Sequence, residues 1–71
     1  MLIVRKEREK QGLSQSKLAR MADINATSLS RIERGLEPPY PKRAKRIADA
    51  LGWKGEPLDL FKEYEDEAIR A

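Results

Sequence analysis

The 71-residue sequence contains no cysteine and no histidine, and its aromatic residues are one tryptophan, two tyrosines and one phenylalanine. The absence of cysteine excludes disulfides and thiolate chemistry. Without histidine as well, the common zinc sites and every nucleophile–histidine dyad are excluded. An enzyme would have to work with carboxylates or lysine, and no paired acidic site is recognisable. We therefore expect no enzymatic activity, no metal and no cofactor.

Long apolar runs are also missing. Only Met1 to Val4 form an apolar run before Arg5, whereas a signal peptide needs a longer one and a membrane span needs roughly 20 apolar residues. We expect a cytoplasmic protein with no membrane partner. A chain of this length holds one domain with a small core, which at this size relies on well-packed helices and often on a partner subunit.

The charges are unevenly distributed along the chain. Residues 1–54 carry 13 Lys and Arg against 6 Asp and Glu, a balance of +7, and residues 55–71 carry 2 against 6, a balance of −4. A basic body with an acidic end favours a polyanionic partner on one face. Charged helices that only keep a small domain soluble would give the same totals, so charge alone leaves both interpretations open.

Helical spacing of apolar residues, interrupted by glycine and proline, predicts an all-α chain with five helices. The expected segments are about 1–11, a second helix capped by Ser14, a third from Ala26 after the N-cap Asn25, a fourth after a proline-rich connector, and an acidic C-terminal helix of about 57–70. Gly12, Gly35 and Gly52 are placed to end three of them. The core is expected within about 1–61 of a single domain spanning 1–71.

The span from Gln15 to Arg34 has the spacing of two helices that cross steeply at a short turn. Such helices need a small residue at their closest approach, here Ala19, and an apolar residue that anchors the turn, here Ile24. Leu29 and Ile32 would then hold the second helix against the first.

Residues 12–35 resemble the helix-turn-helix of the phage-repressor and Cro-like family, often called the XRE family. Gln15 at the start of the second helix and the run from Ile32 to Gly35 carry the resemblance. It implies a compact five-helix bundle of the lambda-repressor-like DNA-binding type, with the helix-turn-helix in helices 2 and 3. Two positions depart from the family pattern: Asp23 stands where glycine is usual, and Glu7 stands where an apolar residue is common. Aspartate tolerates left-handed geometry better than most residues, so the turn survives.

The outward side chains of the third helix are the expected contacts to DNA bases, as in similar repressors. Arg31 is the strongest candidate because its planar fork can bond guanine O6 and N7 together. The base contacts implied are Ala26, Thr27, Ser30 and Arg31. Phosphate contacts are expected from Gln15, Asn25, Ser28, Arg34, Lys42 and Arg43. The alternative is that these are ordinary solvent-facing residues, and for Lys17 that alternative is favoured.

The resemblance also implies a structural ion pair between Arg8 of the first helix and Glu33 of the third. The alternative is that both side chains are exposed charges that contribute little. Five apolar residues late in the chain are expected mostly in the core, and any that remain exposed would be available for a two-fold dimer interface. They are Trp53, Leu58, Leu60, Phe61 and Tyr64. The acidic run Glu63, Glu65, Asp66 and Glu67 should lie away from the phosphates.

Two functions remain open from the sequence. The favoured one is a transcriptional regulator that binds double-stranded DNA as a homodimer on a palindromic operator. Repression is favoured over activation. The alternative is a protein-binding adaptor or an antitoxin on the same fold, for which DNA binding is secondary and a protein is the main partner.

Overall fold

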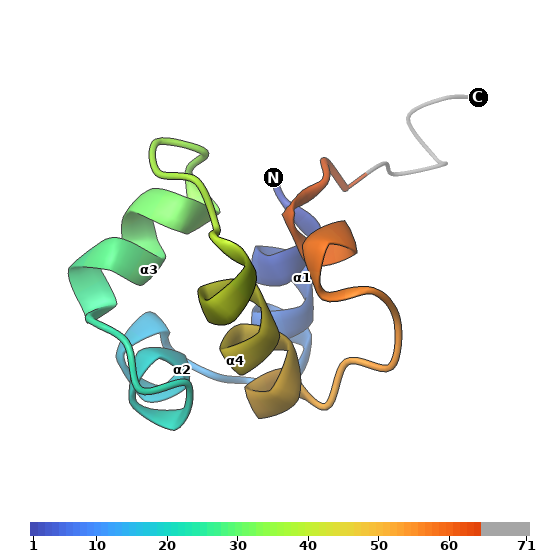
Figure 1. Ribbon diagram of the computed structural model, residues 1–71. Helices are drawn as coiled ribbons and strands as arrows, with labels where there is room; N and C mark the ends of the chain where they lie inside the picture. Colours follow the sequence, from blue (N-terminus) through green and yellow to red (C-terminus); the bar gives the residue numbers. More distant parts are fainter. Residues whose placement is uncertain (65–71) are drawn as a thin grey trace.

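The protein folds into four α-helices and one 3-10 helix, which a computed structural model describes over residues 1–64 (Figure 1). The helices are α1 (Ile3–Lys10), α2 (Gln15–Met21), α3 (Ala26–Glu33), α4 (Pro41–Leu51) and the 3-10 helix η1 (Pro57–Phe61). The prediction of an all-α fold is confirmed over these residues. Over residues 1–64, no helix is both long enough and apolar enough to cross a membrane.

The helix ends follow the predicted capping residues. The Ser14 hydroxyl accepts a hydrogen bond from the Lys17 amide at 3.0 Å, and Asn25 Oδ1 accepts one from the Thr27 amide at 2.7 Å. Gly52 ends α4 in the left-handed conformation, with φ of 70°. These contacts satisfy amides and carbonyls that the helices leave unpaired, so the local sequence determines where α2, α3 and α4 begin or end.

The corner between α2 and α3 depends on Asp23. Its φ is +57°, a conformation that no other non-glycine residue adopts over residues 1–64. The chain reverses there, and the Ile24 amide donates to the Ala19 carbonyl at 2.9 Å. The predicted left-handed aspartate is confirmed, and it lets α3 begin three residues later in a new direction.

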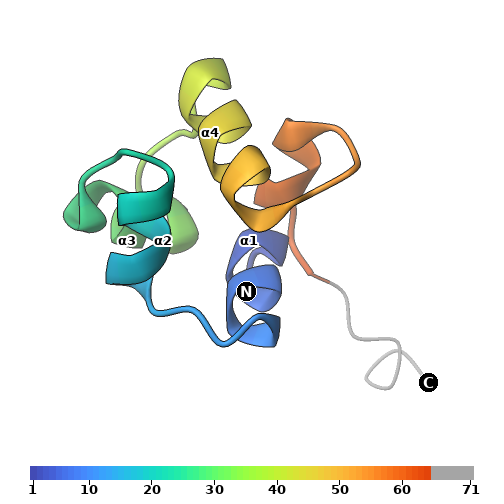
Figure 2. The same ribbon diagram turned by 90° about the horizontal axis from the view of Figure 1, so that it is seen from below.

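The core draws at least one side chain from every helix. The largest fully buried residues are Val4, Leu18, Leu29, Ile32, Ile47 and Leu60. Ala19 is 2% exposed, as expected for a small residue where α2 and α3 pack together. Figure 2 shows α2 and α3 next to each other on one side of the molecule, with η1 against α1 and α4 on the other.

The predicted acidic α-helix of about 57–70 is wrong over the residues that the structure describes. Pro57–Phe61 form a short 3-10 helix, and Lys62 is extended with φ of −84° and ψ of 159°. The chain then lies antiparallel to the N-terminus, where the Ile3 amide donates to the Lys62 carbonyl at 3.0 Å and the Tyr64 amide donates to the Met1 carbonyl at 2.8 Å. The physical reason is that unpaired backbone groups at the start of the chain offer residues 62–64 hydrogen bonds that outweigh helix propensity. The rest of that prediction, residues 65–70, lies outside the described part.

The late apolar residues divide between core and surface. Leu60 is fully buried, and Trp53 and Phe61 pack partly buried against the core. Leu58 and Tyr64 are exposed, at 46% and 38%, and Lys6 Nζ lies 5.3 Å from the centre of the Tyr64 ring. Of the acidic run, Glu63 bonds the N-terminal amine at 2.7 Å, and Glu65, Asp66 and Glu67 lie outside the described residues.

Candidate nucleic-acid interface

The helix α3 lies at the edge of the molecule (Figure 1). Leu29 and Ile32 are buried, and they orient the helix against the rest of the fold. The four predicted base-contacting residues lie on its other side. Ala26, Thr27 and Arg31 are exposed, and Ser30 is half-buried. A short helix with small polar side chains on its free face has the dimensions that the major groove accepts.

A buried ion pair holds the C-terminal end of α3. Arg8 Nε donates to Glu33 Oε2 at 2.8 Å and Arg8 Nη2 donates to Glu33 Oε1 at 3.1 Å, so the predicted pair forms with two parallel bonds. Its side chains are 10% and 1% exposed, respectively. Arg8 Nη1 also donates to the Leu13 carbonyl at 2.7 Å. The pair therefore joins α1, the α1–α2 loop and α3.

The same carboxylate receives the side chain of Gln15, a predicted phosphate contact at the start of α2. Gln15 Nε2 donates to Glu33 Oε1 at 3.0 Å, and the residue is half-buried. In this arrangement the Gln15 amide nitrogen faces Glu33. To reach a phosphate, the Gln15 side chain would have to leave Glu33 and turn outward.

The remaining predicted phosphate contacts lie at both ends of α3 and at the start of α4. Asn25 is exposed and caps α3, Ser28 is half-buried, and exposed Arg34 donates weakly from Nε to the Ser30 carbonyl at 3.4 Å. Lys42 is exposed in the first turn of α4, beside half-buried Arg43. Asn25 and Arg34 thus cap the two ends of α3, and Lys42 and Arg43 lie at the start of the next helix.

The helix-turn-helix geometry is accompanied by a match in sequence. A family profile described as helix-turn-helix matches residues 4–56, a range that reaches from α1 to the loop after α4. The chain belongs to the XRE/Cro-like helix-turn-helix family. No curated protein and no solved structure matches the sequence significantly. Membership of this helix-turn-helix family implies that DNA is the ligand, and the family is typically not enzymatic.

Within the helix-turn-helix domain, Glu37 contacts two of the predicted DNA-binding residues. Glu37 Oε2 accepts a hydrogen bond from Arg43 Nη1 at 2.6 Å, and Glu37 Oε1 lies 4.0 Å from Arg31 Nη1. In the sequence, Glu37 is the first residue of the proline-rich connector between the third and fourth helices. One signal was available, because Glu37 is the single acidic residue between Glu33 and Asp49 in an otherwise basic stretch.

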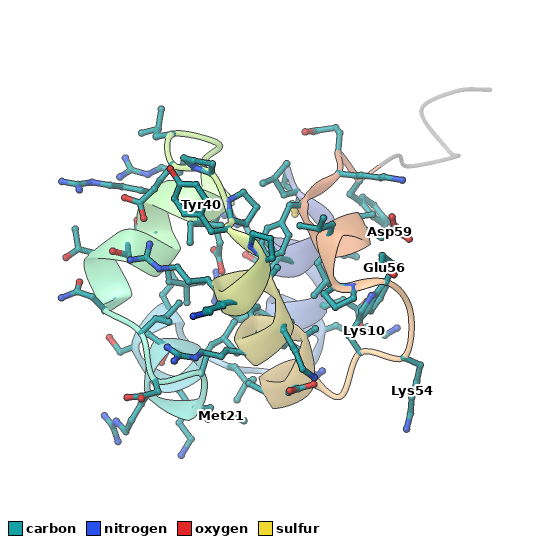
Figure 3. The ribbon with its side chains drawn as sticks, in the orientation of Figure 1. Lys10, Met21, Tyr40, Lys54, Glu56 and Asp59 are labelled. Atoms are coloured by element: carbon teal, nitrogen blue, oxygen red, sulfur yellow. The ribbon has the colours of Figure 1, made fainter. Side chains whose placement is uncertain are left out.

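Tyr40 is a second exposed residue of the connector between α3 and α4. It is 61% exposed at the N-cap position of α4 (Figure 3). A phenol hydroxyl is one of the groups that donate to DNA phosphates. The signal in the sequence is an aromatic residue within a proline-rich connector that also precedes Lys42.

A surface ion pair on α1 contrasts with the buried one. Arg5 Nε donates to Glu9 Oε2 at 3.0 Å, and the hydrogen bond from Arg5 lowers the pKa of Glu9 below its ordinary value. Both side chains are more than 40% exposed. Solvent screens such a pair, so it does not position the helix-turn-helix.

Proposed function

We propose that this protein is a transcriptional regulator that acts as a repressor. It binds double-stranded DNA sequence-specifically by inserting α3 into the major groove. The observation that carries the proposal is the exposed polar face of α3. The buried ion pair of Arg8 and Glu33 fixes the C-terminal end of this helix against α1. A rigid helix with a free polar face is the arrangement that direct reading of base edges requires.

Base reading is assigned to the exposed side of α3. The side chain of Arg31 is 56% exposed, and its planar guanidinium can bond guanine O6 and N7 together. Thr27 can donate to a base or place its methyl group against thymine. Ala26 and Ser30 complete the base-contacting set. Phosphate contacts from Gln15, Asn25, Ser28, Arg34, Lys42 and Arg43 would fix the register of the helix.

A protein-binding role on the same fold is the second candidate. The observation that favours it is an apolar groove between the α3–α4 loop and the N-terminal segment, lined by Leu2, Leu36, Pro38, Pro39 and Phe61 among others. Leu36, one of the lining residues, is 69% exposed. An adaptor or antitoxin would use such a surface, and it would not need Arg31 on the free face of α3.

The test begins with a fluorescent titration of random-sequence duplex at low salt, followed by selection of bound sites from a random pool. We expect binding that weakens steeply with salt, and a selected site with a base pair that depends on Arg31. Arg31→Ala should lose about 1–3 kcal/mol of discrimination at that base pair. Arg5→Ala removes the same charge from an exposed position on α1 and should keep the preference. Absence of any duplex binding would favour the protein-binding role.

A further inference from the structure

Glu37 lies between two arginines that belong to different parts of the proposed DNA interface. Arg31 is on the base-reading face of α3, and Arg43 is in the first turn of α4. The two oxygens of the Glu37 carboxylate are divided between them, at 4.0 Å from Arg31 Nη1 and 2.6 Å from Arg43 Nη1. A carboxylate beside a polyanion opposes binding, so its place at this interface calls for a functional explanation.

We propose that Glu37 is a specificity-determining residue, which orients Arg31 for base contact and restrains Arg43 from sequence-independent phosphate binding. The inference rests on the proposed function, because it needs α3 in the major groove. It predicts that Glu37 lowers affinity for DNA in general while raising the preference for the correct site.

The restraint on Arg43 follows from the short contact. Charge-assisted hydrogen bonds between arginine and carboxylate are among the strongest in proteins, and 2.6 Å is at the short end of their range. The Glu37 side chain is 24% exposed, so water screens the pair less than it screens a free surface pair. A phosphate oxygen must compete with this carboxylate for Arg43, and that competition weakens binding to every sequence equally.

The effect on Arg31 is one of orientation. The side chain of Arg31 is 56% exposed and has four rotatable bonds, so a base contact must pay the cost of ordering it. A carboxylate at 4.0 Å biases the guanidinium toward one region before DNA arrives. Ordering the side chain in advance strengthens binding to the one base that fits its guanidinium and does not strengthen binding to other bases.

The backbone around Glu37 is rigid enough to hold the carboxylate in place. Gly35 turns the chain with φ of 76°, and the Leu36 amide donates to the Arg31 carbonyl at 2.8 Å. Pro38 and Pro39 follow directly, and a residue before proline is restricted to extended conformations. Glu37 therefore has few backbone alternatives.

The experiment compares wild type with Glu37→Gln, Glu37→Asp and Glu56→Gln. Glu56→Gln removes the same charge from an exposed position across the molecule from α3 (Figure 3). Each protein is titrated with the duplex selected from the random pool and with a shuffled duplex of the same composition, at about 50 and 200 mM salt. Thermal unfolding of each variant checks that it is folded.

We expect Glu37→Gln to bind the shuffled duplex more tightly than wild type and Glu56→Gln do. Release of Arg43 should strengthen its phosphate contact and steepen the salt dependence by a slope of at most about 0.9, which makes the loss of affinity between the two salt concentrations up to about threefold larger. The ratio of selected to shuffled affinity should fall by about threefold or more, part of the roughly 5- to 150-fold that a bidentate base contact confers. Glu37→Asp keeps the charge but shortens the side chain, so it should lower that ratio with a smaller gain on shuffled DNA than Glu37→Gln shows.

The outcomes separate this inference from the function on which it rests. If wild type binds neither duplex, the proposed function fails and the inference fails with it. If wild type prefers the selected duplex and Glu37→Gln matches Glu56→Gln on both, only the role of Glu37 is overturned. Equal weakening of both duplexes by Glu37→Gln would also overturn it, because that result indicates a purely structural residue.

Discussion

At the scale of single residues, Glu33 shows how a charged side chain serves the core of a small domain. Its carboxylate is 1% exposed and accepts hydrogen bonds from Arg8 Nε, Arg8 Nη2 and Gln15 Nε2. Removing charges from water is costly, and a buried pair is tolerated only when its hydrogen bonds are well satisfied. The value of the pair therefore lies in the position that it gives α3 relative to α1 and α2.

Arg8→Ala should destabilise the protein by about 3–5 kcal/mol, because it leaves the Glu33 carboxylate buried without its partner and frees the Leu13 carbonyl. The loss is comparable with the whole stability of many small domains. Urea unfolding or the melting temperature would measure it. Arg5→Ala is the matched control, since its exposed pair with Glu9 should contribute at most about 1 kcal/mol. Equal melting temperatures for the two variants would contradict a structural role for Arg8.

At the scale of elements, the corner between α2 and α3 sets the angle at which α3 is presented. Asp23 turns the chain with φ of +57°, Ile24 packs against the core, and Ala19 permits close approach of the helices. Left-handed geometry is strained for residues other than glycine, although aspartate and asparagine tolerate it better than most. The corner therefore stores a small amount of strain that substitution can release.

Asp23→Gly should raise the free energy of unfolding by about 0.5–1 kcal/mol, because glycine adopts the left-handed conformation without strain, although it gains more entropy in the unfolded chain. For a domain of this size the melting temperature would rise by about 2–8 °C. Asp23→Asn is the control, since it removes the charge and keeps tolerance of the left-handed region, and it should melt near wild type. If Asp23→Asn accounts for the whole increase, charge and not backbone strain is responsible.

At the scale of the whole molecule, one chain offers a single α3 and hence one short contact with the major groove. Small DNA-binding domains of this geometry gain affinity by binding as symmetric pairs, whose two recognition helices lie about 34 Å apart on one face of the duplex. Exposed apolar side chains such as Leu36 and Leu58 leave surface with which a second copy could pack.

Selection from the random pool should therefore return a palindrome whose half-site centres are about 10 base pairs apart. Native mass spectrometry of the complex should show two chains per duplex, and a duplex with one half-site scrambled should bind far more weakly. One chain per duplex on an asymmetric site would contradict the symmetric arrangement.

Local sequence alone decided where α2 and α3 begin and where α4 ends. Ser14, Asn25 and Gly52 act through hydrogen bonds or backbone conformations within a few residues, and such contacts can be inferred from neighbouring letters. The corner between α2 and α3 was predictable for the same reason, because Ala19, Asp23 and Ile24 lie within one short stretch.

Contacts that helical spacing does not encode decided the rest. Residues 62–64 are extended, not helical, because their hydrogen-bond partners lie about sixty positions earlier, at the N-terminus. Glu37 meets Arg31 and Arg43 only because the proline connector brings the end of α3 and the start of α4 together. Spacing along the chain encodes which side of a helix a residue occupies, but charge pairing across a loop depends on where two helices finally pack.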